Sequence, residues 1–392
     1  MTHKPGYDVV VIGAGIHGAG IAQAAAAAGY DVLVLEQATV ASGTSSRSSK
    51  LIHGGLRYLE QFHFGLVKEC LAERELLLRI APDLVKLQDF VIPVYRTTSR
   101  RPWQVQTGLS LYTLLGKLAP HSRFERLSVL RWQNPDGLST DGLQAVFRYQ
   151  DAQTDDALLT RAVMSSAELL GAELLESARF VAALGQGDTY TVKYEHQGKL
   201  TEVTARTLVN AAGPWAAKVA ASITPVSPQP ATELVQGSHI VLDEPRVEAI
   251  YYLEAPQDKR AVFVMPWRKQ TLVGTTEVPF DGSDPGSVSP HPSEFEYLQT
   301  VVRNYFPHAK SSIVTSFAGL RVLPAQEGRA FARTRELLIS GFPAKRPRVL
   351  HVYGGKLTSY RADAARAIKL LEHTLPVRKP RADTRQLHLR AV

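Results

Sequence analysis

Four side chains that could do chemistry lie within one short stretch of the sequence, SKLIHGGLRYLE, residues 49–60. They are Lys50, His53, Arg57 and Tyr58, and two adjacent glycines separate the first pair from the second. A lysine and an arginine suit a phosphate or a carboxylate, whereas a glycine pair lets a bound group approach the backbone closely. The stretch therefore predicts a site that uses polar side chains and bare backbone together.

Composition limits the kind of protein that can carry such a site. The chain has 392 residues, of which 44% are hydrophobic and 21% are charged, and this suits a folded protein of two domains. The single cysteine, Cys70, excludes an internal disulfide, and the start MTHKPGYDVV lacks the apolar core of a signal peptide. No apolar run approaches the ~20 residues of a spanning helix. We therefore expect a cytoplasmic protein that does not cross a membrane.

The charge balance indicates an anionic partner. The chain has 45 lysines and arginines against 37 acidic residues, for a formal net charge of +8. Nucleic acid, a phosphorylated substrate and anionic lipid all fit this excess. Nucleic acid is the least favoured, because the sequence has no basic stripe with interleaved aromatic residues. No cluster in the sequence has metal-ligand spacing, and no G-x-S-x-G motif indicates hydrolysis.

The first recognisable unit, residues 7–36, has the order strand, glycine-rich turn, helix, strand. Its turn has the pattern G-x-G-x-x-G at Gly13, Gly15 and Gly18. The first glycine permits the tight turn, the second lets a pyrophosphate approach the backbone, and the third lets the helix pack closely on the strand. Glu36 ends the second strand, where a carboxylate can accept a hydrogen bond from a ribose 2′-hydroxyl. The unit therefore predicts a bound dinucleotide.

FAD and NAD both fit this unit, and later stretches favour FAD. A strand over residues 204–211 closes in NAAGPW, where Gly213 leaves bare backbone at the strand end. A second strand over residues 349–353 leads through two glycines into a helix whose first N–H groups would belong to Leu357 and Thr358. The positive end of that helix would stabilise the negative charge of a reduced flavin. The glycines at both strand ends therefore predict close contact between backbone and flavin.

The opening stretch would cover the other side of the flavin. Its backbone amides, from residues 45–50 and from the glycine pair, could run along the ring, and His53 would pack against the cofactor. The predicted cofactor-binding residues are therefore Gly13, Gly15, Gly18, Glu36, Ser45, Ser46, Lys50, His53, Gly54, Gly213, Gly355, Leu357 and Thr358.

Together these motifs resemble the FAD-dependent glycerol-3-phosphate dehydrogenase family, of the wider glutathione-reductase-like and D-amino-acid-oxidase-like flavoproteins. The resemblance runs from about Tyr7 to His373 and rests on GAGIHGAGIA, TSSRSSKLIHGGLRYLE, NAAGPW, QGSHIVL, VMPW, VGTTE, GLRVL and YGGKLTSYR. The family normally continues into a C-terminal helical domain, whereas this sequence ends in PVRKPRADTRQLHLRAV, a basic tail of low apolar content. The resemblance implies FAD as the cofactor.

The resemblance also implies an α/β fold, in which an antiparallel-sheet substrate domain is inserted into a Rossmann-like FAD-binding domain. Alternating patterns such as SHIVLD predict the antiparallel strands. The expected boundaries are 1–90, 133–224 and 313–375 for the discontinuous FAD-binding domain, 91–132 and 225–312 for the substrate domain, and 376–392 for the basic tail. Residues 66–81 predict a surface helix with Cys70 on its apolar side and Glu73 and Arg74 on its polar side.

Oxidising a secondary alcohol that bears a phosphate requires cations for the dianion, a base for the hydroxyl proton and a flavin facing the carbon that loses hydride. By the resemblance, the residues that line the substrate phosphate and hydroxyl are Arg57, Tyr58, Arg321, Arg333 and Lys356. His239, in GSHIVL, is the candidate base, and Arg321 would stabilise the developing alkoxide. These roles depend on the resemblance, because a lone arginine or histidine is more often a surface or structural residue.

The implied reaction is the oxidation of sn-glycerol 3-phosphate to dihydroxyacetone phosphate, with hydride passing to FAD and then to a quinone or another acceptor. Two alternatives stay open. One is an amino-acid or hydroxy-acid oxidase of the same fold, although a carboxylate needs fewer cations than the predicted site offers. The other is a flavin-binding protein without turnover.

A last stretch, residues 100–120, has features of a segment that binds to a membrane surface. It predicts a helix that follows Arg100 and Arg101 and lies near Lys117. Its apolar residues are Trp103, Leu109, Leu111, Tyr112, Leu114, Leu115 and Leu118. Such a helix can lie among lipid headgroups, although a helix packed on the substrate domain fits the pattern equally well. A peripheral position on the inner face of the cell membrane would let the reduced flavin reach a quinone.

Overall fold

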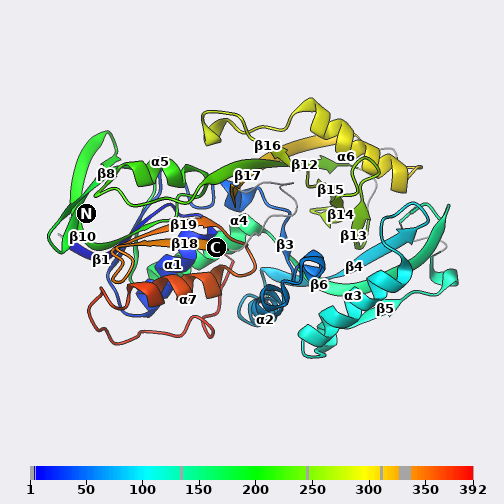
Figure 1. Cartoon of the computed structure of the whole chain (residues 1–392), viewed down its shortest axis with the longest axis horizontal. Coiled ribbons are helices and arrows are strands. Elements are labelled where there is room, and N and C mark those ends of the chain that lie inside the picture. The colour runs from blue at the N-terminus through cyan, green and yellow to red at the C-terminus, as the bar shows by residue number, and fades with distance from the viewer. Residues whose placement is uncertain are drawn as a thin grey trace.

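Two large sheets form the frame of the protein (Figure 1). The first carries the glycine-rich turn, and the second lies beside it. The computed structural model describes residues 4, 6–132, 136–243, 247–309, 312–325 and 337–391.

Nine strands of the described ranges form the first sheet. β1 (Gly6–Ile12) pairs in parallel with β2 (Val32–Leu35) and with β10 (Lys199–Asn210), and β10 pairs in parallel with β19 (Val349–Gly354). The carboxyl ends of these four strands therefore meet at one edge, which is where open parallel sheets bind ligands. The other strands are β7 (Glu173–Leu175), β8 (Ala178–Gln186), β9 (Thr189–His196), β11 (Ile223–Thr224) and β18 (Leu337–Phe342).

Helices cover one face of the first sheet. Val9 and Val11 of β1 share a hydrophobic core with α1 (Ile16–Ala27), α4 (Asp156–Leu169) and α7 (Tyr360–Leu371), and α1 packs against both other helices. Small residues allow this close packing, since a Cβ at Gly20 of α1 would lie 2.7 Å from Tyr360 Cδ2 of α7, and a Cβ at Gly18 would lie 1.9 Å from the Gly13 carbonyl oxygen. Val10 points to the opposite face, where it packs with side chains of β8, β9 and β10. A short helix, α5 (Ala216–Ala221), follows NAAGPW.

The second sheet has ten strands within the described residues and is mostly antiparallel. Its order is β16 (Val278–Pro279), β12 (Thr232–Leu242), β15 (Gln270–Gly274), β14 (Ala261–Trp267), β13 (Ile250–Glu254), β4 (Val85–Tyr95), β6 (Leu143–Thr154) and β3 (Leu51–Ile52), with β17 (Ile313–Pro324) beside β12 and β5 (Phe124–Arg126) beside β6. The antiparallel strands predicted around His239 thus belong to this sheet. Strands β3, β6 and β17 and the first half of β4 also belong to it, although they fall in the ranges expected for the FAD-binding domain.

Helices cover both faces of the second sheet. α6 (Pro292–Tyr305) packs on one face, and α2 (Phe64–Ile80) and α3 (Pro102–Leu115) pack on the other (Figure 1). The prediction that Glu73 and Arg74 lie on the polar, outward side of α2 is wrong, because both side chains are buried. Each has a distant partner that local periodicity cannot indicate: Arg74 Nη1 donates to Asp151 Oδ1 at 2.6 Å, and Glu73 Oε2 accepts from Arg361 Nε at 2.8 Å.

The basic tail packs against the end of α1 on the first sheet and against the end of α2. The backbone N–H of Arg381 donates to the Ala27 carbonyl at 2.7 Å, and that of Leu389 donates to the Ile80 carbonyl at 2.7 Å. Leu389 is only 2% exposed and belongs to the same hydrophobic core as α1. One buried leucine and these backbone hydrogen bonds therefore attach the tail to the rest of the fold. Within the described ranges, no helix combines the length and hydropathy that crossing a membrane requires.

Candidate active site

A cavity of about 380 Å³ lies between the two sheets. The first sheet lines it with the carboxyl ends of β1, β2 and β19 and with the glycine-rich turn that follows β1. The second sheet contributes His239 from β12, Tyr252 from β13 and Arg321 from β17. A ligand that lies along the edge of the first sheet would therefore present one end to side chains of the second.

The turn after β1 forms a cradle of bare backbone in this cavity. Gly13 has φ +100°, and a Cβ there would lie 2.7 Å from the Ala211 carbonyl oxygen, so the position requires glycine. Gly15 precedes the first turn of α1, and the backbone N–H of Ile16 donates to Ser45 Oγ at 2.8 Å. Backbone amides at the positive end of a helix suit a pyrophosphate. Gly13, Gly15 and Ser45, three of the predicted cofactor-binding residues, line the cavity.

Glu36 lies beside this cradle at the end of β2. Its Oε2 accepts from the Ala14 N–H at 2.7 Å, and its Oε1 accepts from the Ala38 N–H at 2.9 Å. These bonds fix the carboxylate on the cavity wall, where it can accept from ribose hydroxyls. The cradle and the acid together fit the adenosine diphosphate half of FAD.

Two further glycines on the cavity wall could accommodate the flavin half. Gly213 and Gly355 line the cavity with φ values of +54° and +89°, and a Cβ at Gly355 would lie 2.4 Å from His17 Nε2. Leu357 and Thr358 also line it, but they form a turn before α7 and are not its first residues. Thr358 Oγ1 accepts from the His53 N–H at 3.2 Å, which joins this turn to the opening stretch. Bare backbone thus faces the cavity from two sides.

Cationic groups converge at the end of the cavity next to the second sheet. Arg321 Nη2 donates to Thr275 Oγ1 at 2.9 Å, whereas its buried Nη1 has no hydrogen-bond partner among the described residues. Lys356 Nζ lies 4.1 Å from the centre of the Tyr58 ring, and it too lacks a hydrogen-bond partner in the part of the chain described. Arg57 Nη2 donates to Tyr58 Oη at 3.0 Å. This end of the cavity therefore suits an anion with several acceptor oxygens.

His239 lies beside these cations on β12. Its Nε2 lies 3.0 Å from Ser49 Oγ, and its Nδ1 is buried without a partner in the described ranges. Burial, helped by the charges of Arg321 and Lys50, holds the pKa of His239 well below its usual value. The imidazole is therefore neutral near pH 7 and can accept a proton. Gly274 on the neighbouring strand leaves room for the ring, since a Cβ there would lie 2.1 Å from His239 Cδ2.

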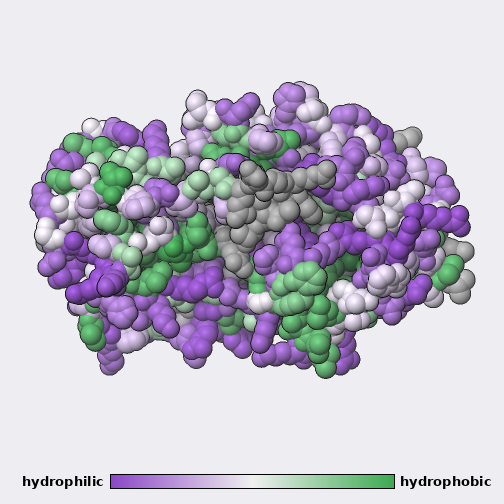
Figure 2. Space-filling view, in the orientation of Figure 1, coloured by the Kyte–Doolittle hydropathy of each residue, from purple (hydrophilic) through white to green (hydrophobic). Residues whose placement is uncertain are grey.

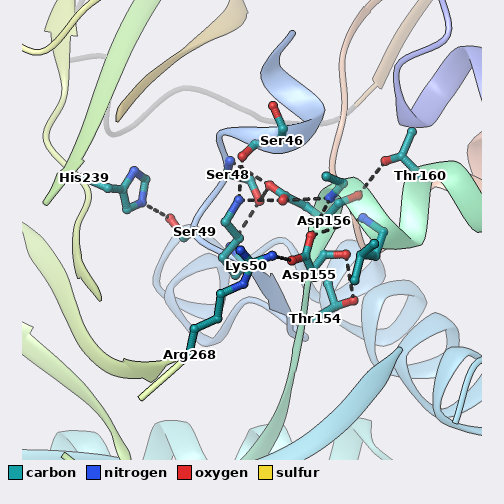
Figure 3. Close-up of polar contacts among 12 residues, drawn as sticks. Ser46, Ser48, Ser49, Lys50, Thr154, Asp155, Asp156, Thr160, His239 and Arg268 are labelled. Atoms are coloured by element: carbon teal, nitrogen blue, oxygen red, sulfur yellow. Dashed lines mark hydrogen bonds and ion pairs between the residues drawn. The ribbon is translucent and has the colours of Figure 1, made fainter. Parts of the chain in front are cut away.

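Lys50 does not line the cavity, and Figure 3 shows its side chain directed towards Asp156 at the start of α4. Its Nζ donates to Asp156 Oδ1 at 2.5 Å and to the Ser46 carbonyl at 2.6 Å, while Ser48 Oγ donates to Asp156 Oδ2 at 2.6 Å. Lys50 thus holds the loop that brings Ser49 to His239, as Figure 3 shows. Of the predicted cofactor residues that the structure describes, four do not line the cavity: Gly18, Ser46, Lys50 and Gly54. Arg333 lies outside the described residues.

Several residues that line the cavity were not predicted individually. Ser49 and Thr275 lie inside quoted motifs, TSSRSSK and VGTTE, but nothing in those motifs indicates that they contact His239 and Arg321. Trp215 ends NAAGPW, and its ring would be in van der Waals contact with a Cβ at Gly43. Asp156 follows another aspartate at the start of α4, a pattern that indicates only a helix N-terminus.

The chain is similar to known flavoproteins over almost its whole length. Residues 8–361 match the family described as FAD dependent oxidoreductase, DAO. Glycerol-3-phosphate dehydrogenase of Pseudomonas aeruginosa is 39% identical over 374 residues, which cover 93% of this chain and 72% of that protein. D-erythritol 1-phosphate dehydrogenase of Brucella abortus is 36% identical over 385 residues, covering 96% of this chain and 76% of that protein.

A solved structure agrees in fold. The structure of glycerol-3-phosphate dehydrogenase from Bacillus halodurans complexed with FAD has a TM-score of 0.75 at 24% identity, covering 98% of this chain and 68% of that one. This likeness confirms the α/β fold that the sequence predicts, and the cradle, Glu36 and the glycine-lined flavin half fit its cofactor. The chain therefore belongs to the FAD-dependent oxidoreductase family, among relatives named glycerol-3-phosphate dehydrogenase, and it is an enzyme with FAD as its cofactor.

Proposed function

We propose that this enzyme oxidises sn-glycerol 3-phosphate to dihydroxyacetone phosphate and passes the electrons from FAD to a quinone. The names of its relatives support this substrate. The structural observation that carries the proposal is the pair of buried nitrogens, Arg321 Nη1 and Lys356 Nζ, that lack hydrogen-bond partners among the described residues. Burying cationic groups without partners is unfavourable. A phosphate dianion would supply the missing acceptor for Lys356, and the oxygen on C2 of the same substrate would supply one for Arg321.

In the proposed reaction, side chains of the second sheet and of the opening stretch act on a secondary alcohol. Arg57, Tyr58 and Lys356 bind the phosphate, with Arg333 as a further proposed cation. His239 accepts the proton of the hydroxyl on C2, and Arg321 stabilises the negative charge that grows on that oxygen as the carbonyl forms. When bound, FAD accepts the hydride that leaves C2.

Two other activities remain as alternatives. An amino-acid or hydroxy-acid oxidase of the same fold would bind a carboxylate, which needs fewer cations. A flavin-binding protein without turnover would keep the cavity but not the chemistry. D-erythritol 1-phosphate, the substrate in the name of one relative, also carries a phosphate, so the cations alone do not discriminate it from glycerol 3-phosphate.

Anaerobic mixing of the holoenzyme with candidate substrates tests the proposal. Glycerol 3-phosphate should bleach the yellow flavin rapidly, whereas plain glycerol and simple amino or hydroxy acids should bleach it only slowly at high concentration. Faster bleaching by D-erythritol 1-phosphate would reassign the substrate within the phosphorylated polyols. Faster bleaching by a carboxylate, or no bleaching by any of these compounds, would overturn the proposal.

A quinone acceptor is dissolved in the membrane, so the proposal includes a peripheral position of the enzyme on an anionic membrane surface. Figure 2 shows a hydrophobic area on the side of the molecule where α2 and α3 lie in Figure 1. The large apolar side chains exposed on and next to these helices are Phe62, Phe64, Trp103, Leu114 and Leu118. Arg100, expected to attract lipid, pairs instead with Glu60, so the attraction would come from Arg101 and Lys117. Docking here would bring the reduced enzyme to a lipid-soluble acceptor.

A further inference from the structure

We propose that Tyr112 is a positioning residue for the substrate site, because its hydroxyl ties the turn that carries Arg57 and Tyr58 to a buried ion pair. This inference rests on the proposed function, in which those two residues bind the substrate phosphate. Tyr112 lies on α3, is completely buried, and does not belong to the residues that line the cavity. Its ring also makes an edge-to-face contact with Tyr149, which does line the cavity. A change that keeps the ring and removes only the hydroxyl would therefore act on the substrate through the turn.

A continuous chain of hydrogen bonds connects Tyr112 to the turn. The backbone N–H of Gly54 donates to Tyr112 Oη at 2.9 Å, and Tyr112 Oη donates to Asp151 Oδ2 at 2.6 Å. Asp151 Oδ1 accepts from Arg74 Nη1 at 2.6 Å. Asp151 and Arg74 are as fully buried as Tyr112, so water does not compete for these bonds. The Tyr112 hydroxyl thus donates its proton to the Asp151 carboxylate and accepts the Gly54 N–H on a lone pair.

The protonation state of this hydroxyl is fixed. Burial, together with the charge of Asp151, raises the pKa of Tyr112 well above its usual value. Tyr112 therefore stays protonated across the pH range in which enzymes work, so it donates to Asp151 and accepts from the Gly54 N–H throughout that range. The link is a permanent structural contact and not a switch.

The shape of the turn depends on this contact. A Cβ at Gly54 would lie 2.4 Å from Tyr112 Oη, so only glycine allows the backbone to come so close. Gly55 follows with φ +75°, and its carbonyl accepts from the Tyr58 N–H at 2.9 Å, which starts the 3-10 helix η2 (Leu56–Gln61). Arg57 lies in the first turn of η2, so fixing Gly54 fixes the point from which Arg57 and Tyr58 extend.

Tyr58 in turn organises the cations. Its Oη accepts from Arg57 Nη2 at 3.0 Å, and its ring lies 4.1 Å from Lys356 Nζ. The turn has a second anchor, the bond from the His53 N–H to Thr358 Oγ1, on the flavin side. Without the Tyr112 hydroxyl the flavin-side anchor would remain, while the Gly54 N–H would lose its 2.9 Å bond and keep only its interaction with the Asp151 carboxylate. The segment that bears Arg57 would therefore be held less firmly. We therefore expect substrate binding to suffer more than the chemical step.

Tyr112→Phe removes the hydroxyl and keeps the ring, and Tyr95→Phe is its matched control. Tyr95 is also buried in the second sheet, its Oη donates to the Ser139 carbonyl at 2.6 Å, and it does not line the cavity. In anaerobic flavin reduction by the holoenzyme, Tyr112→Phe should raise the glycerol 3-phosphate concentration for half-maximal rate roughly three- to tenfold, the effect of one lost hydrogen bond. The limiting rate should change less than about twofold. Tyr95→Phe should lose comparable thermal stability without either kinetic change.

Hydrogen exchange gives a readout that does not depend on turnover. The Gly54 amide should exchange slowly in wild type and in Tyr95→Phe, and faster in Tyr112→Phe. Rapid exchange at Gly54 in wild type, or unchanged substrate affinity in a folded Tyr112→Phe enzyme, would overturn the inference. If wild type is not bleached by glycerol 3-phosphate at all, the proposed function fails instead, while the exchange measurement still tests the link between Tyr112 and Gly54.

Discussion

The rings of His239 and Phe317 stack with their centroids 4.9 Å apart and an interplanar angle of 16°. Lys50 Nζ also lies close to the Phe317 ring, 5.1 Å from its centre. The imidazole thus packs on an aromatic surface and lies within reach of the positive charges of Arg321 and Lys50. Together with burial, these charges favour its neutral form. A base is therefore available at neutral pH before substrate binds.

The first prediction tests His239 as that base. His239→Ala should slow flavin reduction by about a hundredfold or more, the usual contribution of a general base, and leave FAD bound. In wild type, reduction by plain glycerol should stay constant as pH falls through 6.5, because the pKa of His239 is lowered and glycerol has no phosphate to titrate. Stopped-flow absorbance checks both. A rate that halves near pH 6.5 or above, or a normal rate in the variant, would contradict the assignment.

The second prediction concerns the substrate phosphate. Lys356→Ala should weaken glycerol 3-phosphate binding by roughly 1.5 to 3 kcal/mol, the range of hydrogen bonds to charged groups. It should barely change reduction by plain glycerol, which lacks the phosphate. Lys369→Ala, an exposed lysine on α7, is the charge-matched control and should behave as wild type. An equal loss with both substrates would mean that Lys356 supports the fold or the cofactor.

The sequence predicts the fold and much of the site, because its strongest signals are local. The turn after the first strand requires Gly13 and Gly15, and Gly213 and Gly355 follow the ends of predicted strands. Each of these glycines could therefore be recognised as a candidate from the residues next to it in the sequence. His239 and Arg321 have no local signature of chemistry. They were predicted through the family resemblance, and the structure brings them together because β17 pairs directly with β12.

Contacts between distant segments could not be predicted in this way. Lys50 was expected beside the flavin, but Asp156, more than a hundred residues away, binds its ammonium group. Arg74 was expected at the surface, but Asp151 allows it to be buried. Helical periodicity assigns a charged residue to solvent unless a partner is known. Such partners appear only when the sheets and helices are assembled.

The third prediction concerns the cofactor. We expect acid treatment to release FAD from the purified enzyme, because the sequence has no recognisable covalent attachment motif. Glu36→Gln should weaken FAD binding by about tenfold or more, since the charged acceptor for ribose hydroxyls is lost. Glu296→Gln, an exposed substitution on α6, is the control. Recovery of FMN or NAD, or flavin that remains on the precipitated protein, would contradict the first expectation, and unchanged FAD affinity in Glu36→Gln would contradict the second.

The fourth prediction concerns stability and pH. His351 is buried, accepts from Asn210 Nδ2 at 3.1 Å, and has its Nε2 2.8 Å from Ser227 Oγ. Burial lowers the pKa of His351 to about 4, against 6.5 in the unfolded chain. Between pH 6.5 and pH 4, His351 therefore binds a proton in the unfolded chain but stays neutral in the folded protein. The stabilisation that comes from keeping His351 neutral is fully present above pH 6.5. As pH falls towards 4, the free energy of unfolding decreases by up to about 3 kcal/mol.

Thermal unfolding across this pH range checks the fourth prediction. His351→Gln should be less stable than wild type at pH 7, but its melting temperature should fall less steeply between pH 6.5 and pH 4. His239 has a lowered pKa as well and contributes in the same direction, so the difference between the two proteins isolates His351. Parallel curves would show that His351 does not titrate as its burial implies.

The fifth prediction concerns the proposed membrane surface. Leu109 and Tyr112 of α3 face the core, whereas Trp103 is 67% exposed, Leu114 62% and Leu118, just beyond the helix, 58%. This division leaves apolar side chains on the outer face that no described residue covers. We expect the protein to sediment with anionic vesicles at low salt and to leave them at high salt, because salt screens the attraction between basic residues and lipid.

Replacing Trp103, Leu114 and Leu118 together by serine distinguishes docking through this surface from nonspecific binding to vesicles. The triple variant should lose most of its vesicle binding, because the buried apolar area drives insertion among the headgroups, and it should keep its FAD because these side chains do not line the cavity. Leu169→Ser is the control, since Leu169 is 87% exposed at the end of α4 on the other sheet. If wild type ignores anionic vesicles even at low salt, α3 is only a packing helix, and the enzyme, if it turns over, delivers its electrons to a soluble acceptor.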